Sequence, residues 1–198
     1  WYFLGLLVFY LGLTRVSEIV LGRLTTRLSH GQATVAGEAG LSQGIINLHF
    51  QSKDRLLLET LSFVVDEYKS RWEKALSRAG ESSAERLLAL VEVDFHPSLC
   101  DRNKLAVWFA FWGQAKYRPN YQKIHNKFDN ERSMELKRIC AELISDGGYR
   151  VQTAKEAAHA IEALLDGLWL SLLLYPTDET REESRVICMK AIARLFPD

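Results

Sequence analysis

Residues 36–57 have the sequence AGEAGLSQGIINLHFQSKDRLL, and this stretch decides which fold we expect for the chain. Residues 34–40 form a predicted short helix that ends at Gly40, whose freedom to adopt a left-handed conformation suits a tight turn. Ser42 is a suitable N-cap for a second short helix over residues 43–50. Two short helices joined by such a turn are typical of a helix-turn-helix.

The second short helix has an apolar side and a polar side. Ile45 and Phe50 can anchor it to neighbouring helices, and its outward-facing side chains are then Gln43, Asn47 and His49. A helix that reads the major groove of DNA needs hydrogen-bonding side chains opposite a buried stripe. The pattern also fits any helical hairpin capped by Ser and Gly, so by itself it leaves DNA binding and a purely structural role open.

Outside this stretch the chain also has the spacing of amphipathic helices. Three helix starts carry a capping box, in which a hydroxyl and a Glu three residues later bind free backbone N–H groups: Ser82 with Glu85, Thr153 with Glu156 and Thr180 with Glu183. The predicted helices cover residues 15–30, 34–40, 43–50, 53–78, 83–95, 101–117, 120–146, 153–175 and 180–196. We therefore expect an all-α protein, with a leader and helix-turn-helix DNA-binding domain at 1–52 and a larger helical ligand-binding and dimerisation domain at 53–198.

Composition excludes several other classes of protein. The chain of 198 residues is 47% hydrophobic and 25% charged with a formal net charge of zero, so any DNA-binding face must be local. Its three cysteines, Cys100, Cys140 and Cys188, are far apart and odd in number, which argues against a disulfide framework. Catalytic and nucleotide-binding motifs are absent from the sequence, so we expect no enzyme, no cofactor and no metal site.

The first 13 residues, WYFLGLLVFYLGL, form an apolar leader. A membrane span needs about 20 such residues, and Arg15 and Glu18 follow too soon after this run. The basic start and the small-residue cleavage site of a signal peptide are also missing. We therefore expect no membrane association and a cytoplasmic location, which also agrees with the cysteine usage.

Two helices of the larger domain carry many aromatic residues. Residues 105–117, LAVWFAFWGQAKY, contain Trp108, Trp112 and Tyr117, and residues 161–172, IEALLDGLWLSL, contain Asp166 and Trp169. A carboxylate among aromatic rings suits a quaternary ammonium ligand, because the ring faces attract a cation that has no hydrogen-bond donor. The alternative is that these rings only fill the core.

The stretch 36–57 resembles the helix-turn-helix of the TetR family and the start of the family's next helix. The matching residues are Ala36, Ala39, Gly40, Leu41, Ser42, Gly44, His49, Phe50, Ser52, Lys53 and Leu56. The resemblance implies contacts to operator DNA by Ser42, Gln43, Gly44, Asn47, Leu48, His49 and Lys53. Two departures stand out: Asn47 replaces the usual Tyr, and the segment between Gly31 and Val35 is shorter than in the family. A degenerate helical protein without DNA function is therefore a further alternative.

The aromatic motifs AVWFAFW at 106–112 and LLDGLWL at 164–170 resemble a narrower group, the BetI-type repressors of betaine synthesis within the TetR family. The resemblance implies a repressor released from a palindromic operator by choline or another quaternary ammonium, with Trp108, Trp112, Tyr117, Asp166 and Trp169 as candidate ligand residues. It also implies a homodimer through helices 153–175 and 180–196. The alternative is a TetR-like regulator of an unrelated lipophilic or cationic ligand.

Overall fold

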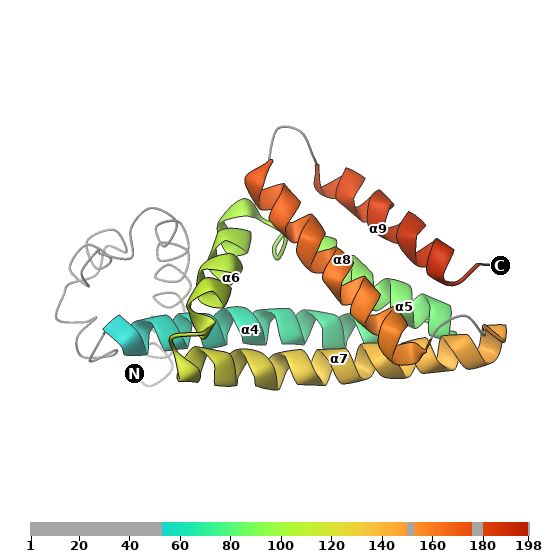
Figure 1. Cartoon of the computed structure of the whole chain (residues 1–198), viewed down its shortest axis with the longest axis horizontal. Helices are drawn as coiled ribbons and strands as arrows, with labels where there is room; N and C mark the ends of the chain where they lie inside the picture. The colour runs from blue at the N-terminus through green and yellow to red at the C-terminus, as the bar shows by residue number, and fades with distance from the viewer. Residues whose placement is uncertain (1–52, 150–152, 176–179, 198) are drawn as a thin grey trace, which may run out of the picture. The chain divides into compact units, whose positions relative to one another are not determined.

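The computed structural model describes residues 53–149, 153–175 and 180–197 (Figure 1), and the predicted helices at 15–30, 34–40 and 43–50 lie outside these residues. The described part of the chain contains helices and no strands, which confirms the predicted all-α class. Its elements are α4 (Lys53–Arg78), α5 (Ser83–Glu92), the 3-10 helix η1 (Val93–Phe95), α6 (Arg102–Ala115), α7 (Pro119–Gly147), α8 (Ala154–Leu174) and α9 (Arg181–Leu195).

The chain divides into two compact units, each built from segments distant in sequence. The first consists of Trp1–Asp66 and Ala106–Ile124, and the second of Glu67–Leu105 and His125–Asp198. The predicted domain boundary at 52/53 falls where the described residues begin, so it stays a prediction.

The first unit has an aromatic core on α6 and the start of α7. Val107 and Trp108 are buried, and the ring of Phe111 meets that of Tyr121 edge-on at 5.1 Å between centroids. On α4, the buried residues Leu61, Val64 and Val65 follow the three-and-four spacing of a helix with one apolar side.

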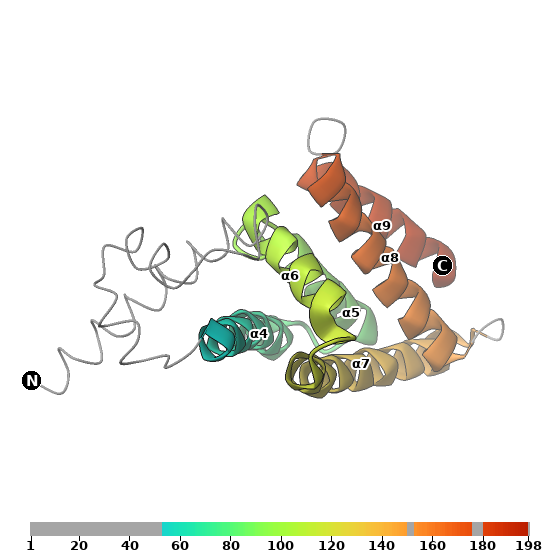
Figure 2. The same ribbon diagram turned by 60° about the vertical axis from the view of Figure 1, so that its left-hand side comes forward.

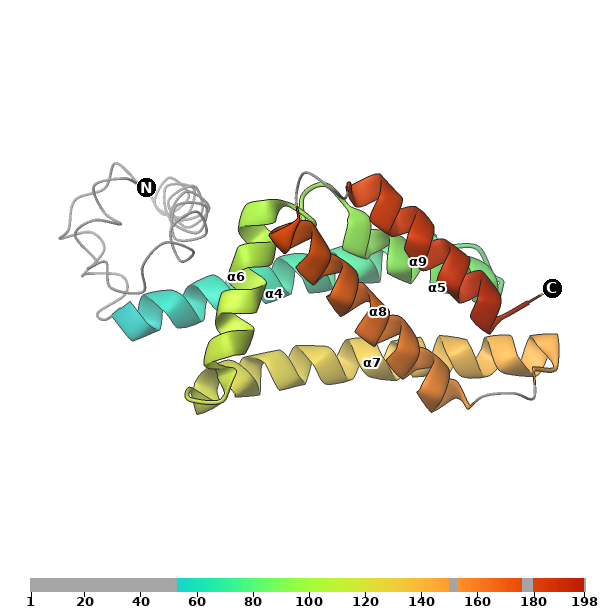
Figure 3. The same cartoon turned by 45° about the horizontal axis from the view of Figure 1, so that its top comes forward.

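The second unit contains α5, η1, α8 and α9 together with parts of α4, α6 and α7. Helices α8 and α9 lie side by side in antiparallel directions, as all three views show (Figures 1, 2 and 3). Burial of Ile161 and Leu165 on α8, and of Cys188 and Ile192 on α9, gives this pair an apolar core.

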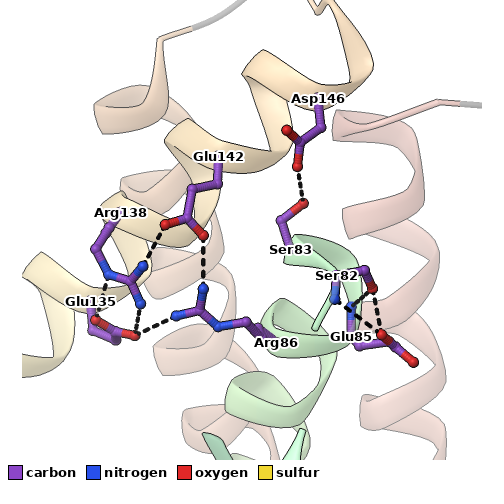
Figure 4. A network of polar contacts seen from close by, with 8 residues as sticks. All are labelled: Ser82, Ser83, Glu85, Arg86, Glu135, Arg138, Glu142 and Asp146. Carbon is purple, nitrogen blue, oxygen red and sulfur yellow. Dashed lines mark hydrogen bonds and ion pairs between the residues drawn. The ribbon is translucent and has the colours of Figure 1, made fainter. Parts of the chain in front are cut away.

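A polar network joins α5 to α7 within the second unit (Figure 4). Arg86 on α5 donates to Glu142 at 2.8 Å and to Glu135 at 3.1 Å, and Arg138 on α7 pairs with the same two carboxylates. Ser83 also donates to Asp146 at 3.0 Å. Because Arg86 and Ser83 both cross between the helices, their three hydrogen bonds fix how α5 lies along α7.

The predicted capping boxes are all present. Ser82, Thr153 and Thr180 accept from the backbone N–H groups of Glu85, Glu156 and Glu183, whose carboxylates accept in return from the cap residues. These reciprocal bonds satisfy N–H groups that the first turn of a helix leaves without partners.

One predicted helix, 83–95, is divided in the structure. The α-helix ends at Glu92, and Val93–Phe95 form the tighter 3-10 turn η1. The reason is Pro97, since the residue before a proline is disfavoured in the α conformation and His96 is extended, with φ −66° and ψ 133°. This break places Asp94 inside the second unit, where it is buried.

Helix α8 is long and apolar enough to cross a membrane by length and composition alone. Within the described residues it packs against α9, and its sequence includes Lys155, Glu156, Glu162 and Asp166. A core helix satisfies the same criteria of length and apolarity, so this property is weak support for a membrane span.

The three cysteines are free and buried. Burial raises the pKa of Cys100 to about 12, that of Cys140 to about 11 and that of Cys188 to about 12. Each thiol is therefore protonated and unreactive near neutral pH, because the thiolate is the nucleophile.

Candidate functional site

Asp94 of η1 is the centre of a buried polar cluster in the second unit. Its carboxylate accepts from the hydroxyl of Tyr68 on α4 and from Arg132 Nη2 on α7 at 2.7 Å. Its backbone oxygen accepts from the indole N–H of Trp169 on α8 at 3.0 Å. We call these four residues the Asp94 network. Through this network, α4, α7 and α8 are each hydrogen-bonded to one residue of η1.

An aromatic ring lies against the cation of this network, and two further rings pack on that ring. The guanidinium carbon of Arg132 lies 5.6 Å from the centroid of the Tyr68 ring, a cation–π distance. The Tyr68 ring also meets the rings of Phe128 at 5.1 Å and Trp169 at 5.8 Å. Tyr68 is only 5% exposed, so its ring is enclosed by these neighbours.

The titration behaviour of the Asp94 network follows from its burial. Burial raises the pKa of Tyr68 well above its ordinary value, so the hydroxyl keeps its proton as a donor. Burial also raises the pKa of Asp94, while Arg132 and Tyr68 counteract that shift. For Arg132, burial is the largest single influence and favours the neutral form, but Asp94, Tyr68 and Glu162 together outweigh it and raise the pKa of the guanidinium. Arg132 is therefore a permanently charged cation inside the unit.

Carboxylates outnumber cations around the Asp94 network. Asp166 on α8 has an exposed surface, but the protein around its carboxyl group removes part of the water that would solvate it. This desolvation is the largest cause that raises the pKa of Asp166 to about 6. The charges of Asp94, Asp129 and Glu162 raise that pKa further, while Arg132 opposes them. Of these carboxylates, Asp94 is the one that is hydrogen-bonded to Arg132. An additional cation without hydrogen-bond donors is the ligand that such a region and its rings suit chemically.

The predicted ligand residues fall into both units. In the first unit the structure brings Trp108 and Trp112 together, with ring centroids 6.3 Å apart, and Tyr117 is 72% exposed. In the second unit Asp166 and Trp169 share α8, and Trp169 is buried with its N–H already bonded to Asp94. Whether any of these five residues contacts a ligand stays a prediction.

Sequence analysis did not identify Tyr68, Asp94, Phe128 and Arg132 as site residues. One signal was available for α7, where Phe128, Arg132 and Leu136 follow at intervals of four and are all buried. An Arg on an apolar stripe requires a partner, because a buried charge is costly unless it is paired. The partner lies 38 residues away in sequence, however, and only the fold reveals it.

The predicted DNA-contacting residues Ser42, Gln43, Gly44, Asn47, Leu48 and His49 lie outside the described residues. Lys53 is the first residue of α4. It directly follows the predicted helix-turn-helix in the chain, which is where the family resemblance requires a phosphate contact.

Comparison with known proteins identifies the class of this fold. The family model for the C-terminal domain of BetI-type transcriptional repressors matches residues 83–197. The HTH-type transcriptional regulator BetI of Escherichia coli K12 is 29% identical over 157 residues, which cover 77% of each chain.

Two crystal structures are similar over nearly the whole chain. A transcriptional regulator from Pseudomonas aeruginosa PAO1 has a TM-score of 0.78 and 29% identity, covering 92% of this chain and 89% of its own. A transcriptional regulator from Saccharomonospora viridis, solved in complex with choline, has a TM-score of 0.78 and 26% identity, covering 91% and 94%.

These similarities define a TetR-like transcriptional regulator, with a DNA-binding helix-turn-helix and a helical ligand-binding domain. The chain belongs to the BetI-type family of these regulators. The prediction that it is not an enzyme is confirmed, since its relatives are regulators of transcription.

Proposed function

We propose that this regulator is a cytoplasmic repressor that binds a palindromic operator as a homodimer and leaves it when choline, or a closely related quaternary ammonium, binds. The observation that carries the proposal is the cation of Arg132 held against the ring of Tyr68 beside Asp94. A region that stabilises one cation with an aromatic ring and a carboxylate has the chemistry to bind another cation in its place.

The charge balance and the relatives both support a cationic ligand. Asp166, Glu162 and Asp129 add negative charge around a single buried cation. The Saccharomonospora viridis regulator was solved in complex with choline. In our proposal Asp166 and Trp169 belong to the ligand site of the second unit, and Trp108, Trp112 and Tyr117 stay separate candidates within the first unit.

The apolar surface of α8 and α9 supports a homodimer. Leu170 and Leu174 on α8 and Ile187 on α9 are 41%, 56% and 47% exposed, although each is a large apolar side chain. Burial of such residues against a second copy is favourable by about 25 cal/mol per Å² of apolar surface. A two-fold dimer also presents two recognition helices to the two halves of a palindrome.

Three measurements test this function together. A gel shift on the DNA upstream of the gene should give a complex with the protein, and choline should dissociate that complex. The neutral isostere of choline, with carbon in place of the ammonium nitrogen, is the matched control and should not dissociate it, because it lacks the charge. The variants Gln43→Ala and Asn47→Ala should lose the complex while they keep choline binding measured by tryptophan fluorescence.

Two outcomes would contradict the proposal. If choline changes neither operator affinity nor tryptophan fluorescence, while lipophilic cations from a panel do, the ligand is a different cation and the alternative regulator is correct. If the protein binds no upstream DNA at any concentration that maintains a dimer, the repressor assignment fails.

A further inference from the structure

The inference concerns Arg132, whose guanidinium already occupies the kind of position that a quaternary ammonium ligand would take. Its carbon lies 5.6 Å from the Tyr68 centroid, and its Nη2 donates to Asp94 at 2.7 Å. Tyr68, Phe128 and Trp169 are only 5%, 7% and 4% exposed. In the structure described here, these rings present no open face to a ligand.

A cation can therefore reach the Tyr68 ring only if a neighbour moves away. Phe128 and Trp169 are held by ring packing, and Trp169 is also held by its hydrogen bond to Asp94. Arg132 is the neighbour that an incoming cation repels, since two like charges on one ring in a region of low dielectric oppose each other strongly.

Arg132 is also incompletely bonded where it stands. Its Nε is buried and has no hydrogen-bond partner among the described residues. An unsatisfied buried donor favours movement of its side chain into solvent, because water there would accept its hydrogen bond. An arriving cation would replace the charge of Arg132 beside Asp94 and Tyr68 one for one, so the charge balance of the region would be kept.

Displacement of Arg132 would affect α4 through Asp94. The Tyr68 hydroxyl and Arg132 bind the two different carboxylate oxygens of Asp94, so both depend on one carboxylate orientation. Tyr68 lies on α4, which continues as one helix back to Lys53, directly after the predicted DNA-reading segment.

We propose that Arg132 is an internal competitor of the inducer and that Tyr68 is a positioning residue. The hydrogen bonds of Arg132 and Tyr68 to Asp94 hold α4 in the DNA-binding form. A quaternary ammonium releases α4 because it displaces Arg132 from the Tyr68 ring. This inference rests on the proposed function, since it specifies how the ligand acts at that site. It assigns the response to the inducer to the hydrogen bond between the Tyr68 hydroxyl and Asp94. Tyr68→Phe removes this bond and keeps the aromatic ring.

The variant Tyr68→Phe separates this role from a purely structural one. A hydrogen bond to a charged acceptor changes an equilibrium constant by about tenfold or more. Loss of the bond should therefore weaken operator binding without inducer by at least about fivefold. By linkage, the same shift toward the released form should tighten choline binding by a similar factor. A variant that was only damaged would bind choline more weakly.

The experiment measures operator affinity without inducer and choline affinity for the full-length wild type, Tyr68→Phe and Tyr149→Phe. The Tyr149 variant is the matched control, because that ring packs on Phe196 and takes no part in the Asp94 network. Weaker operator binding together with tighter choline binding, in Tyr68→Phe alone, supports the proposal. Operator affinity within twofold of wild type, or weaker binding of both partners, overturns it.

A second variant tests Arg132 directly. Arg132→Gln replaces the cation at the ring with a shorter, neutral polar side chain, and a folded variant should bind choline at least about threefold more tightly. Weaker choline binding by folded Arg132→Gln overturns the competitor role of Arg132. If this variant does not fold, the measurements on Tyr68→Phe decide the proposal alone. If the wild type binds the operator and choline does not change that binding, the proposed inducer is wrong. The operator affinity of Tyr68→Phe then still tests whether Tyr68 holds α4 in the DNA-binding form.

Discussion

Replacement of Asp94 by Ala should destabilise the protein strongly, because it leaves the Arg132 charge buried without a partner. Asp94 is 3% exposed and Arg132 is 8% exposed, so water cannot replace the lost carboxylate. Breaking such a pair by removing one partner costs about 3–5 kcal/mol. The free energy of unfolding of a whole protein is only about 5–15 kcal/mol, so the loss is a large part of it.

The assay is thermal and denaturant unfolding followed by circular dichroism. For a chain of this length, each kcal/mol lowers the melting temperature by about 2–4 °C, so Asp94→Ala should lower it by about 6–20 °C. Asp66→Ala, on the exposed surface of α4, is the matched control and should change the free energy of unfolding by less than about 0.5 kcal/mol.

A double-mutant cycle isolates the interaction itself. Arg132→Met replaces the guanidinium with an apolar side chain of similar length, and buried ion pairs replaced in this way often cost little. The Asp94→Ala/Arg132→Met protein should therefore be at least about 2 kcal/mol more stable than the sum of the single losses implies. Additive losses, or a loss below about 1 kcal/mol for Asp94→Ala, would refute the reasoning that the two charges depend on each other.

Three further outcomes follow from the described contacts. Because the pKa of Asp166 is raised from 3.8 to about 6, the folded protein holds that proton to higher pH than the unfolded chain, so this group lowers stability as pH rises between those values. The carboxylate forms over the same range, so choline affinity, measured by tryptophan fluorescence, should rise from pH 5 to 7 in wild type and stay level in Asp166→Asn. Arg86→Met should lose about 1–2 kcal/mol in denaturant unfolding, since it removes the two hydrogen bonds of Arg86 to α7, whereas the more exposed Arg138→Met should lose less than about 1 kcal/mol. Thr153→Ala should cost about 1 kcal/mol in thermal unfolding through loss of the cap of α8, and an unchanged melting temperature would contradict that role.

The helices could be predicted because their signals are local. The capping boxes at Ser82, Thr153 and Thr180 lie within four residues of each helix start, and each forms as predicted. The one divided helix, α5 and η1, was also marked locally by Pro97, although the prediction continued the helix to residue 95.

The candidate site could be predicted only in part, because its contacts are not local. Trp169 was selected from the aromatic content of its helix, but its hydrogen bond to Asp94 joins residues 75 positions apart. Arg132 lies in a helix with many charged residues, and its place between Phe128 and Leu136 on one stripe is the single local sign of its burial. Its burial depends on the position of η1, which only tertiary packing determines.

The enclosed cysteines offer a practical tool for following the regulator. Because Cys100, Cys140 and Cys188 are buried thiols with raised pKa, a thiol-reactive dye should label the native chain slowly and the opened chain quickly. The natural protein therefore carries its own probe of global opening. An added surface cysteine would accept a fluorophore without prior removal of the native three, which would let single molecules be observed as they exchange between DNA and solution.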